Sequence, residues 1–193
     1  MAEIVFDIET YGDIRNKQNL KVTCVSLYNY DTDSYHSFDE HQLGDLWPIL
    51  EKADRLIGYN SKFFDVPILN NFYTGDLNVI PHLDILEKIK ESSGKRFKLD
   101  DVAKATLQIS KSADGLAAIK WYEEGKIDEI KKYCEQDVKV TKEVYDFGKK
   151  NKMLYYPTLT GDVLPIAVDF DEAPQAAHAA VQQAGNINLT LGI

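Results

Sequence analysis

The amino-terminal part of the chain has the alternating apolar and polar positions that are typical of strands. Residues 3–9, 21–30 and 34–38 are rich in Ile, Val, Phe and Tyr, and an Asp-Thr-Asp turn separates the second run from the third. Because such short connections join strands that run in opposite directions, we expect these three segments to form an antiparallel meander.

Helical periodicity begins after residue 39. Leu43, Leu46, Trp47 and Leu50 recur at the spacing of one helix face. The remaining expected elements are strands at 55–58 and 163–170, helices over 64–73, 99–107, 114–124 and 127–152, and a strand or helix start within 81–91.

The expected order along the chain is strands first, then strands alternating with helices, and then helices. This order is typical of a mixed α/β domain built around one sheet. We expect helices on both faces of that sheet. A chain of 193 residues has the length of a single domain. The sequence predicts one domain over residues 1–172, followed by an Ala- and Gln-rich tail at 173–193 that is expected to be loosely ordered.

Composition restricts the partners and the compartment. The chain carries 22 Lys and Arg against 31 Asp and Glu, a formal charge of −9. Most of such a surface repels a polyanion, so a nucleic-acid site must be local or bring its own cations. No apolar run approaches the ~20 residues that cross a bilayer, and the strand-like amino terminus leaves no room for a signal peptide, so we expect a cytoplasmic protein without membrane contact. Cys24 and Cys134 form neither a disulfide framework nor a zinc-ligand set.

Two acids in the first predicted strand are candidates for chemistry. Asp7 and Glu9 are two residues apart, so both carboxylates point to one face while Phe6 and Ile8 point to the other. Side-by-side acids within a sheet cost repulsion and desolvation. Chance alone gives about one Asp-x-Glu in a chain this acidic, and an exposed strand end is the simpler alternative.

Two further groups of polar residues, in a turn before a helix and within the long helix, are also candidates for a functional site. Asn60 lies in a turn after the strand at 55–58, and Asp65 lies near the start of a helix, where the helix dipole favours a carboxylate. Tyr133 and Asp137 are four residues apart in the long predicted helix and therefore share a face. Taken singly, each group has a structural alternative: a turn residue with a helix-start acid, or a half-buried aromatic beside a solvated acid.

In this order, the three groups resemble the three motifs of the DEDD superfamily of 3′→5′ exonucleases, which have a ribonuclease H-like fold. The resemblance rests on Asp7-Ile8-Glu9, on residues 60–65 and on residues 133–137, includes the helical run at 98–107, and extends to about residue 150. The histidine branch of the superfamily would need His five residues before Asp137, where this chain has Lys132. The tyrosine four residues before Asp137 matches the tyrosine branch.

The resemblance implies a ribonuclease H-like mixed sheet flanked by helices and a two-metal site. Asp7, Glu9, Asp65 and Asp137 would hold two divalent cations, Mg²⁺ or Mn²⁺, and Tyr133 would orient the attacking water. Two such ions ~3.5–4 Å apart activate a water and neutralise charge on the attacking and leaving oxygens of a phosphodiester. Carboxylate oxygens are their preferred ligands. The ions would offset the acidity of the chain where it meets nucleic acid.

Substrate contacts are expected around the same motifs. The residues that the resemblance implies are Thr10, Tyr11, Asn60 and Phe64. Aromatic rings stack terminal bases, a role open to Tyr11, Phe63 and Phe64, although a core position is the alternative for Phe64. Six cationic residues near the second motif are candidates for phosphate contacts: Lys62, Lys88, Lys90, Lys95, Arg96 and Lys98. The alternative is that they form a solvated charged face. The histidines show no metal-ligand spacing and are expected at surface or capping positions: His36, His41, His82 and His178.

The activity implied by the resemblance is metal-dependent 3′→5′ exonuclease action on single-stranded ends, with DNA favoured over RNA and nucleoside monophosphates released. The expected partners are single-stranded DNA or RNA with a free 3′ end and a polymerase or other replication or repair protein. Two alternatives remain open: a ribonuclease H-like endonuclease, which lacks the late Tyr and Asp pair, and a catalytically silent nucleic-acid-binding or polymerase-associated subunit of the same fold. The intact set of acids argues against the silent subunit.

Overall fold

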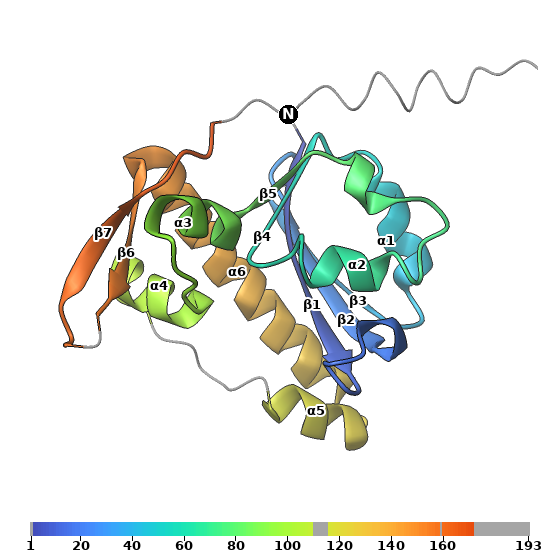
Figure 1. Ribbon diagram of the computed structural model, residues 1–193. Helices are drawn as coiled ribbons and strands as arrows, with labels where there is room; N and C mark the ends of the chain where they lie inside the picture. Colours follow the sequence, from blue (N-terminus) through green and yellow to red (C-terminus); the bar gives the residue numbers. More distant parts are fainter. Residues whose placement is uncertain (1, 110–115, 159, 172–193) are drawn as a thin grey trace, which may run out of the picture.

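The computed structural model describes residues 2–109, 116–158 and 160–171, and its centre is a five-stranded mixed sheet (Figure 1). The strand order is β3-β2-β1-β4-β5. The strands are β1 (Glu3–Tyr11), β2 (Lys21–Asn29), β3 (Ser34–Asp39), β4 (Arg55–Gly58) and β5 (His82–Asp84). β2 is antiparallel to β1 and β3, whereas β4 is parallel to β1 and β5. The antiparallel meander expected for the first three strands is therefore confirmed.

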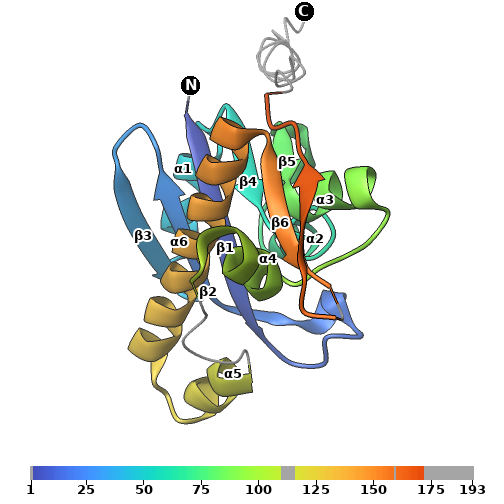
Figure 2. The same cartoon turned by 90° about the vertical axis from the view of Figure 1, so that its left-hand side faces the viewer.

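Helices cover both faces of the sheet, which confirms the α/β fold class (Figure 1). Two helices cover one face: α1 (Leu43–Leu50) and α2 (Asp65–Leu69). Three helices pack with the core on the other face: α3 (Ile85–Ser93), α4 (Leu99–Leu107) and α6 (Ile127–Asn151). The remaining helices are α5 (Leu116–Glu123), beside the carboxyl end of β1, and the short 3₁₀ helices η1 (Lys17–Asn19) and η2 (Leu77–Val79). Figure 2 shows α6 lying across β1 and β2. No helix in the described part of the chain is long and apolar enough to span a bilayer.

The alternation along β1 determines which face carries its acids. Ile4, Phe6 and Ile8 are buried in the core that includes α1 and α2, whereas Val5 belongs to the core that includes α6. Because successive side chains of a strand point to opposite faces, the acids at positions 7 and 9 project toward α6.

The carboxyl-terminal part differs from the expectation. A separate two-stranded antiparallel sheet is formed by β6 (Met153–Pro157) and β7 (Val163–Ala167). The strand expected at 163–170 is therefore shorter, and β6 is not predicted, because Met-Leu-Tyr-Tyr-Pro follows a long helix directly and shows no alternation of apolar and polar positions. The tail predicted at 173–193 lies outside the described residues, as does the start of the helix expected at 114–124, of which α5 forms the rest.

Two elements in the middle of the chain also differ from the sequence pattern. α2 has five residues rather than covering 64–73, because the side chain of Asn70 turns the chain: its Oδ1 accepts the N–H of Leu77 and its Nδ2 donates to Asp76, at 2.9 and 3.0 Å. The strand or helix start expected within 81–91 is β5 followed directly by α3.

His82 contradicts the expectation of a surface or capping position. It is half-buried in β5, and its Nε2 lies 2.9 Å from Oγ of the buried Ser61. Burial lowers the pKa of His82 to about 3, and the charge of Lys62 acts in the same direction, so the imidazole is neutral near pH 7. His36 and His41 are exposed as expected, and the histidine at position 178 lies outside the described residues.

The contact between α6 and the segment after β7 provides a test of packing. Gly148 is buried, and a Cβ there would lie 2.4 Å from Cε2 of Phe170, whose ring is fully buried and stacked on Tyr145. Gly148→Ala should lower the free energy of unfolding by ~1–3 kcal/mol, the usual cost of overpacking. Gly44 of α1 has nothing within 4 Å of the added atom, so Gly44→Ala is the matched control and should leave stability unchanged or raise it, because Ala favours helix. Equal effects of the two substitutions on urea unfolding curves would contradict this packing.

Candidate metal centre

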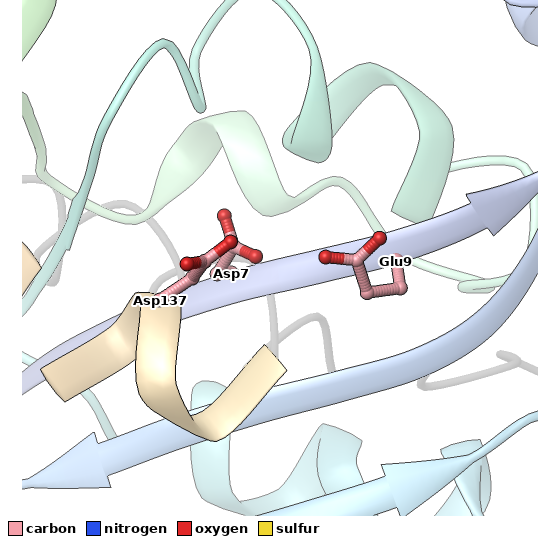
Figure 3. A group of neighbouring side chains, drawn as sticks. All are labelled: Asp7, Glu9 and Asp137. Atoms are coloured by element: carbon pink, nitrogen blue, oxygen red, sulfur yellow. The ribbon is translucent and has the colours of Figure 1, made fainter. Parts of the chain in front are cut away.

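Three carboxylates converge where α6 crosses β1. Asp7, Glu9 and Asp137 each offer one oxygen, and these oxygens all lie within 4.8 Å of one another. Figure 3 shows the first two side chains on β1 and the third on α6. Asp137 is buried, and the other two are half-buried. Like charges at this separation repel one another, so the fold holds these groups together against their electrostatic preference.

A buried thiol joins α6 to the acidic strand. Cys134 precedes Asp137 by about one helical turn, and its Sγ lies 3.4 Å from the backbone oxygen of Asp7 and 3.8 Å from Oδ2 of the same residue. Cys24 is directly opposite Glu9 in the β1–β2 register, and both cysteines are fully buried. Burial raises the pKa of the Cys134 thiol, as do Cys24 and the nearby carboxylates. The protonated thiol therefore donates to Asp7.

A β-bulge follows Glu9. The pairing of β1 with β2 changes register between Glu9 and Thr10, and bulges redirect the side chains that come next. Tyr11 lies against α5, where its ring centroid is 4.9 Å from that of Tyr122 and its hydroxyl donates to Glu123 at 3.2 Å. Thr10 is half-buried at the bulge.

Tyr133 lies on the same face of α6 as Asp137, one helical turn away. Its side chain is buried, and its ring meets that of Trp121 on α5 edge-on, with the centroids 6.0 Å apart. This contact restrains the phenol ring between α5 and α6.

Asp65, the fourth acid expected at the centre, is the first residue of α2 and is not part of the group of three. It is 4% exposed, and its carboxylate accepts the N–H of Ile8, the residue between the two acids of β1. The pKa of Asp65 is raised to about 7, mainly by burial and also by the charge of Asp84, while backbone N–H groups and Lys17 act in the opposite direction. The structure thus brings Asp65 beside β1, outside the tight group.

The two phenylalanines before this acid differ in exposure. Phe64 is half-buried and packs against the core beneath α1 and α2. Phe63 is 65% exposed. Lys17 Nζ lies 3.7 Å from the ring centroid of Phe63 and 5.8 Å from that of Phe64. The accessible ring is therefore that of Phe63.

The turn that carries Asn60 depends on an acid that the three motifs do not include. Asn60 has a left-handed backbone conformation, with φ of 64°. Its N–H and that of Lys62 donate to the two carboxylate oxygens of Asp84, at 2.8 and 3.0 Å. Asp84 also caps α3 by accepting the N–H groups of Leu86 and Glu87. An Asp directly before a helix, with Glu three residues later, is the sequence signal that could have located it.

The donor set of the tight group fits hard divalent cations. Mg²⁺ and Mn²⁺ prefer carboxylate oxygens, and three acids supply them within 4.8 Å. The group contains no His or Cys, the side chains that zinc sites are usually built from. Asp7, Glu9 and Asp137 therefore have the chemistry of a magnesium or manganese site.

Comparisons with known proteins agree with the fold. Among solved structures, a family B DNA polymerase from the hyperthermophilic archaeon Pyrobaculum calidifontis is similar, with a TM-score of 0.62 and 17% sequence identity. The similarity covers 77% of this chain and 24% of the polymerase, so the chain spans about a quarter of that protein's length. No curated protein matches. A family model of the RNase H superfamily matches residues 4–147, most of the chain, and the protein therefore belongs to the RNase H superfamily.

Proposed function

We propose that this protein is a metal-dependent 3′→5′ exonuclease. It would hydrolyse phosphodiester bonds at the 3′ end of single-stranded nucleic acid, with DNA favoured over RNA, and release nucleoside monophosphates. The observation that carries this proposal is the group of three carboxylates, whose oxygens lie within 4.8 Å of one another in a chain of the RNase H superfamily. Such a group destabilises a fold that binds no cation, so a cation-dependent reaction accounts for it.

The acids would hold two divalent cations, Mg²⁺ or Mn²⁺. Glu9 and Asp137 would complete one site together with Asp7, and Asp65 would support the second ion from its position beside β1. When bound, such cations lower the pKa of a water and neutralise charge on the phosphate.

The remaining assigned residues would act on the water and on the substrate. Tyr133 would orient the attacking water from the neighbouring turn of α6, as in the tyrosine branch of the DEDD superfamily. The proposed substrate-binding residues are Thr10, Tyr11, Asn60 and Phe64.

The likeness to a polymerase bears on the partners. We propose single-stranded DNA or RNA with a free 3′ end as substrate and a polymerase or other replication or repair protein as partner. A catalytically silent, polymerase-associated subunit is the second candidate, because the similar solved structure is a polymerase of which the chain covers 24%. The acidic group favours the enzyme, since a silent subunit would be more stable without it.

Removal of one carboxylate should abolish the reaction. We expect wild-type protein with Mg²⁺ or Mn²⁺ to convert 5′-labelled single-stranded DNA into a descending ladder of products, and EDTA to stop it. Asp7→Asn and Asp137→Asn should each eliminate the ladder, because each replaces a negatively charged metal-ligating carboxylate with a neutral amide and removes no apolar contact. Asp31→Asn, in the exposed turn between β2 and β3, is the matched control and should match wild type.

Circular dichroism of the same samples shows whether each variant is folded. A folded Asp7→Asn or Asp137→Asn protein with more than a trace of activity would refute the metal assignment. Cleavage of circular single-stranded DNA by the wild type would indicate an endonuclease instead.

Loss of the Tyr133 hydroxyl should slow the reaction without affecting the fold. Tyr133→Phe keeps the buried ring and its contact with Trp121, and positioning of a reacting water is worth ~10²–10⁴ in rate. We therefore expect kcat to fall by about that factor at saturating metal, with the native circular dichroism spectrum retained. Tyr156→Phe, in β6, is the control. Wild-type kcat in Tyr133→Phe would mean that this tyrosine only fills the interior.

A further inference from the structure

The surface beside α2 presents an exposed aromatic ring next to two cations. The ammonium of Lys17 lies 3.7 Å from the ring centroid of Phe63 and donates to the backbone oxygen of the same residue. The guanidinium of Arg96 also lies near this ring, with its Cζ 5.9 Å from the ring centroid. The three residues come from η1, the turn before α2 and the connection between α3 and α4. The arrangement is therefore created by the fold and not by local sequence.

A cavity of about 220 Å³ adjoins this ring, and a second cavity of about 400 Å³ lies on the other side of Asn60 and Arg96, which line both. Lys90 and Phe63 line the first, and Lys98 lines the second. Arg96 Nη2 donates to Oδ1 of Asn60 at 2.6 Å, which holds the guanidinium where the cavities meet. We refer to the surface formed by these five residues as the Arg96 groove.

The cations of the Arg96 groove are available to a ligand. Lys90, Arg96 and Lys98 are exposed, and within residues 2–109, 116–158 and 160–171 no ion pair joins them to a carboxylate. The formal charge of the whole chain is −9, so three cations without an ion pair to the described residues, on one surface, contrast with the composition. A local excess of positive charge indicates an anionic ligand.

The two acids that also line the first cavity are engaged elsewhere. Glu87 pairs with Lys62, with the charged atoms 2.5 Å apart. Asp84 is buried and accepts backbone N–H groups from the turn at 60–62 and from the start of α3. Neither carboxylate therefore competes for the cations of the groove.

The Arg96 groove begins beside the metal centre. Phe63 is two residues before Asp65, whose carboxylate accepts the N–H of Ile8 between the two acids of β1. The charge of Lys17 acts both on the Phe63 ring and on Asp65. A strand that ends at the three carboxylates can therefore continue along the groove.

We propose that the Arg96 groove binds the part of a single-stranded nucleic acid that leads up to the metal centre, with a base stacked on Phe63 and phosphates held by Arg96 and Lys90. Cationic side chains contact phosphates, exposed aromatic faces stack bases, and a planar guanidinium does both. An acidic peptide would satisfy the cations and leave the exposed ring without a planar partner. The direction of the strand rests on the proposed exonuclease function, whereas binding itself requires no hydrolysis.

Binding is measured in EDTA, by fluorescence anisotropy of a short labelled oligo(dT) with the full chain. The double variant Lys90→Ala, Arg96→Ala should weaken binding about tenfold or more at low salt and reduce the slope of log affinity against log salt by ~1.4, since each phosphate contact to a single strand contributes ~0.7. The control is the double variant Lys139→Ala, Lys150→Ala, which removes two exposed lysines of α6 and should bind as wild type does. Phe63→Ala should weaken binding and leave the salt slope unchanged, because it removes a ring and no charge.

Hydrolysis provides the second readout. With Mn²⁺, the double variant Lys90→Ala, Arg96→Ala should raise KM for oligo(dT), whereas the control Lys139→Ala, Lys150→Ala should keep the wild-type KM. Absence of all hydrolysis by the wild type would count against the exonuclease, while the anisotropy in EDTA would still decide on the groove. Wild-type binding by the double variant Lys90→Ala, Arg96→Ala would overturn the proposal. So would equal competition by an oligo-aspartate peptide, which would assign the groove to acidic peptides.

Discussion

The register between β1 and α6 is the constraint on which the rest of the structure depends. Tyr145 of α6 donates its hydroxyl to both carboxylate oxygens of Glu3, at 3.0 and 3.1 Å. From Glu3 to Asp7 the strand advances about 13 Å, and from Tyr145 back to Asp137 the helix covers about 12 Å. Because the two lengths agree, fixing Tyr145 against Glu3 brings Asp137 opposite Asp7. Opposite charges stabilise the Glu3 end of this contact, and like charges meet at the Asp7 end. Burial raises the pKa of Glu3, but Lys149 and Arg55, whose charged nitrogens lie 2.9 and 2.5 Å from its carboxylate, lower it below the usual value.

Under the proposed function, this arrangement accounts for how an acidic protein would act on a polyanion. With a formal charge of −9, the surface as a whole repels nucleic acid. The three converging carboxylates repel one another, and cations bound there would reverse the sign of the charge at the place where the phosphate of the proposed substrate would approach. The Arg96 groove adds positive charge next to that place. The proposed affinity for nucleic acid would then be local, with one contribution from bound metal and another from the cations of the groove.

The acids of the candidate centre are predictable because their spacing matches the period of the element that carries them. Asp7 and Glu9 share one face of a strand, and Asp137 lies on the inner face of an amphipathic helix. Contacts between segments far apart in sequence are not predictable in this way. Asp84 holds a turn 24 positions earlier, and Arg96 bonds to a side chain 36 positions earlier. For the same reason, no local pattern reveals that a strand histidine is half-buried against Ser61, that β6 pairs with β7, or that the fourth expected acid lies beside the tight group and not within it.

The central claim, that the three converging carboxylates are a divalent-cation site, is tested most directly by thermal unfolding with and without Mn²⁺ at constant ionic strength. Binding confined to the native state adds ~2.7 kcal/mol at a hundred times Kd, and each kcal/mol corresponds to ~2–4 °C for a domain of this size. The account predicts that Mn²⁺ raises the melting temperature of the wild type by several degrees. It also predicts that Asp7→Asn melts higher than the wild type in EDTA, because one repelling charge is gone, and loses most of the gain from Mn²⁺. Identical wild-type curves with and without Mn²⁺ would contradict the claim.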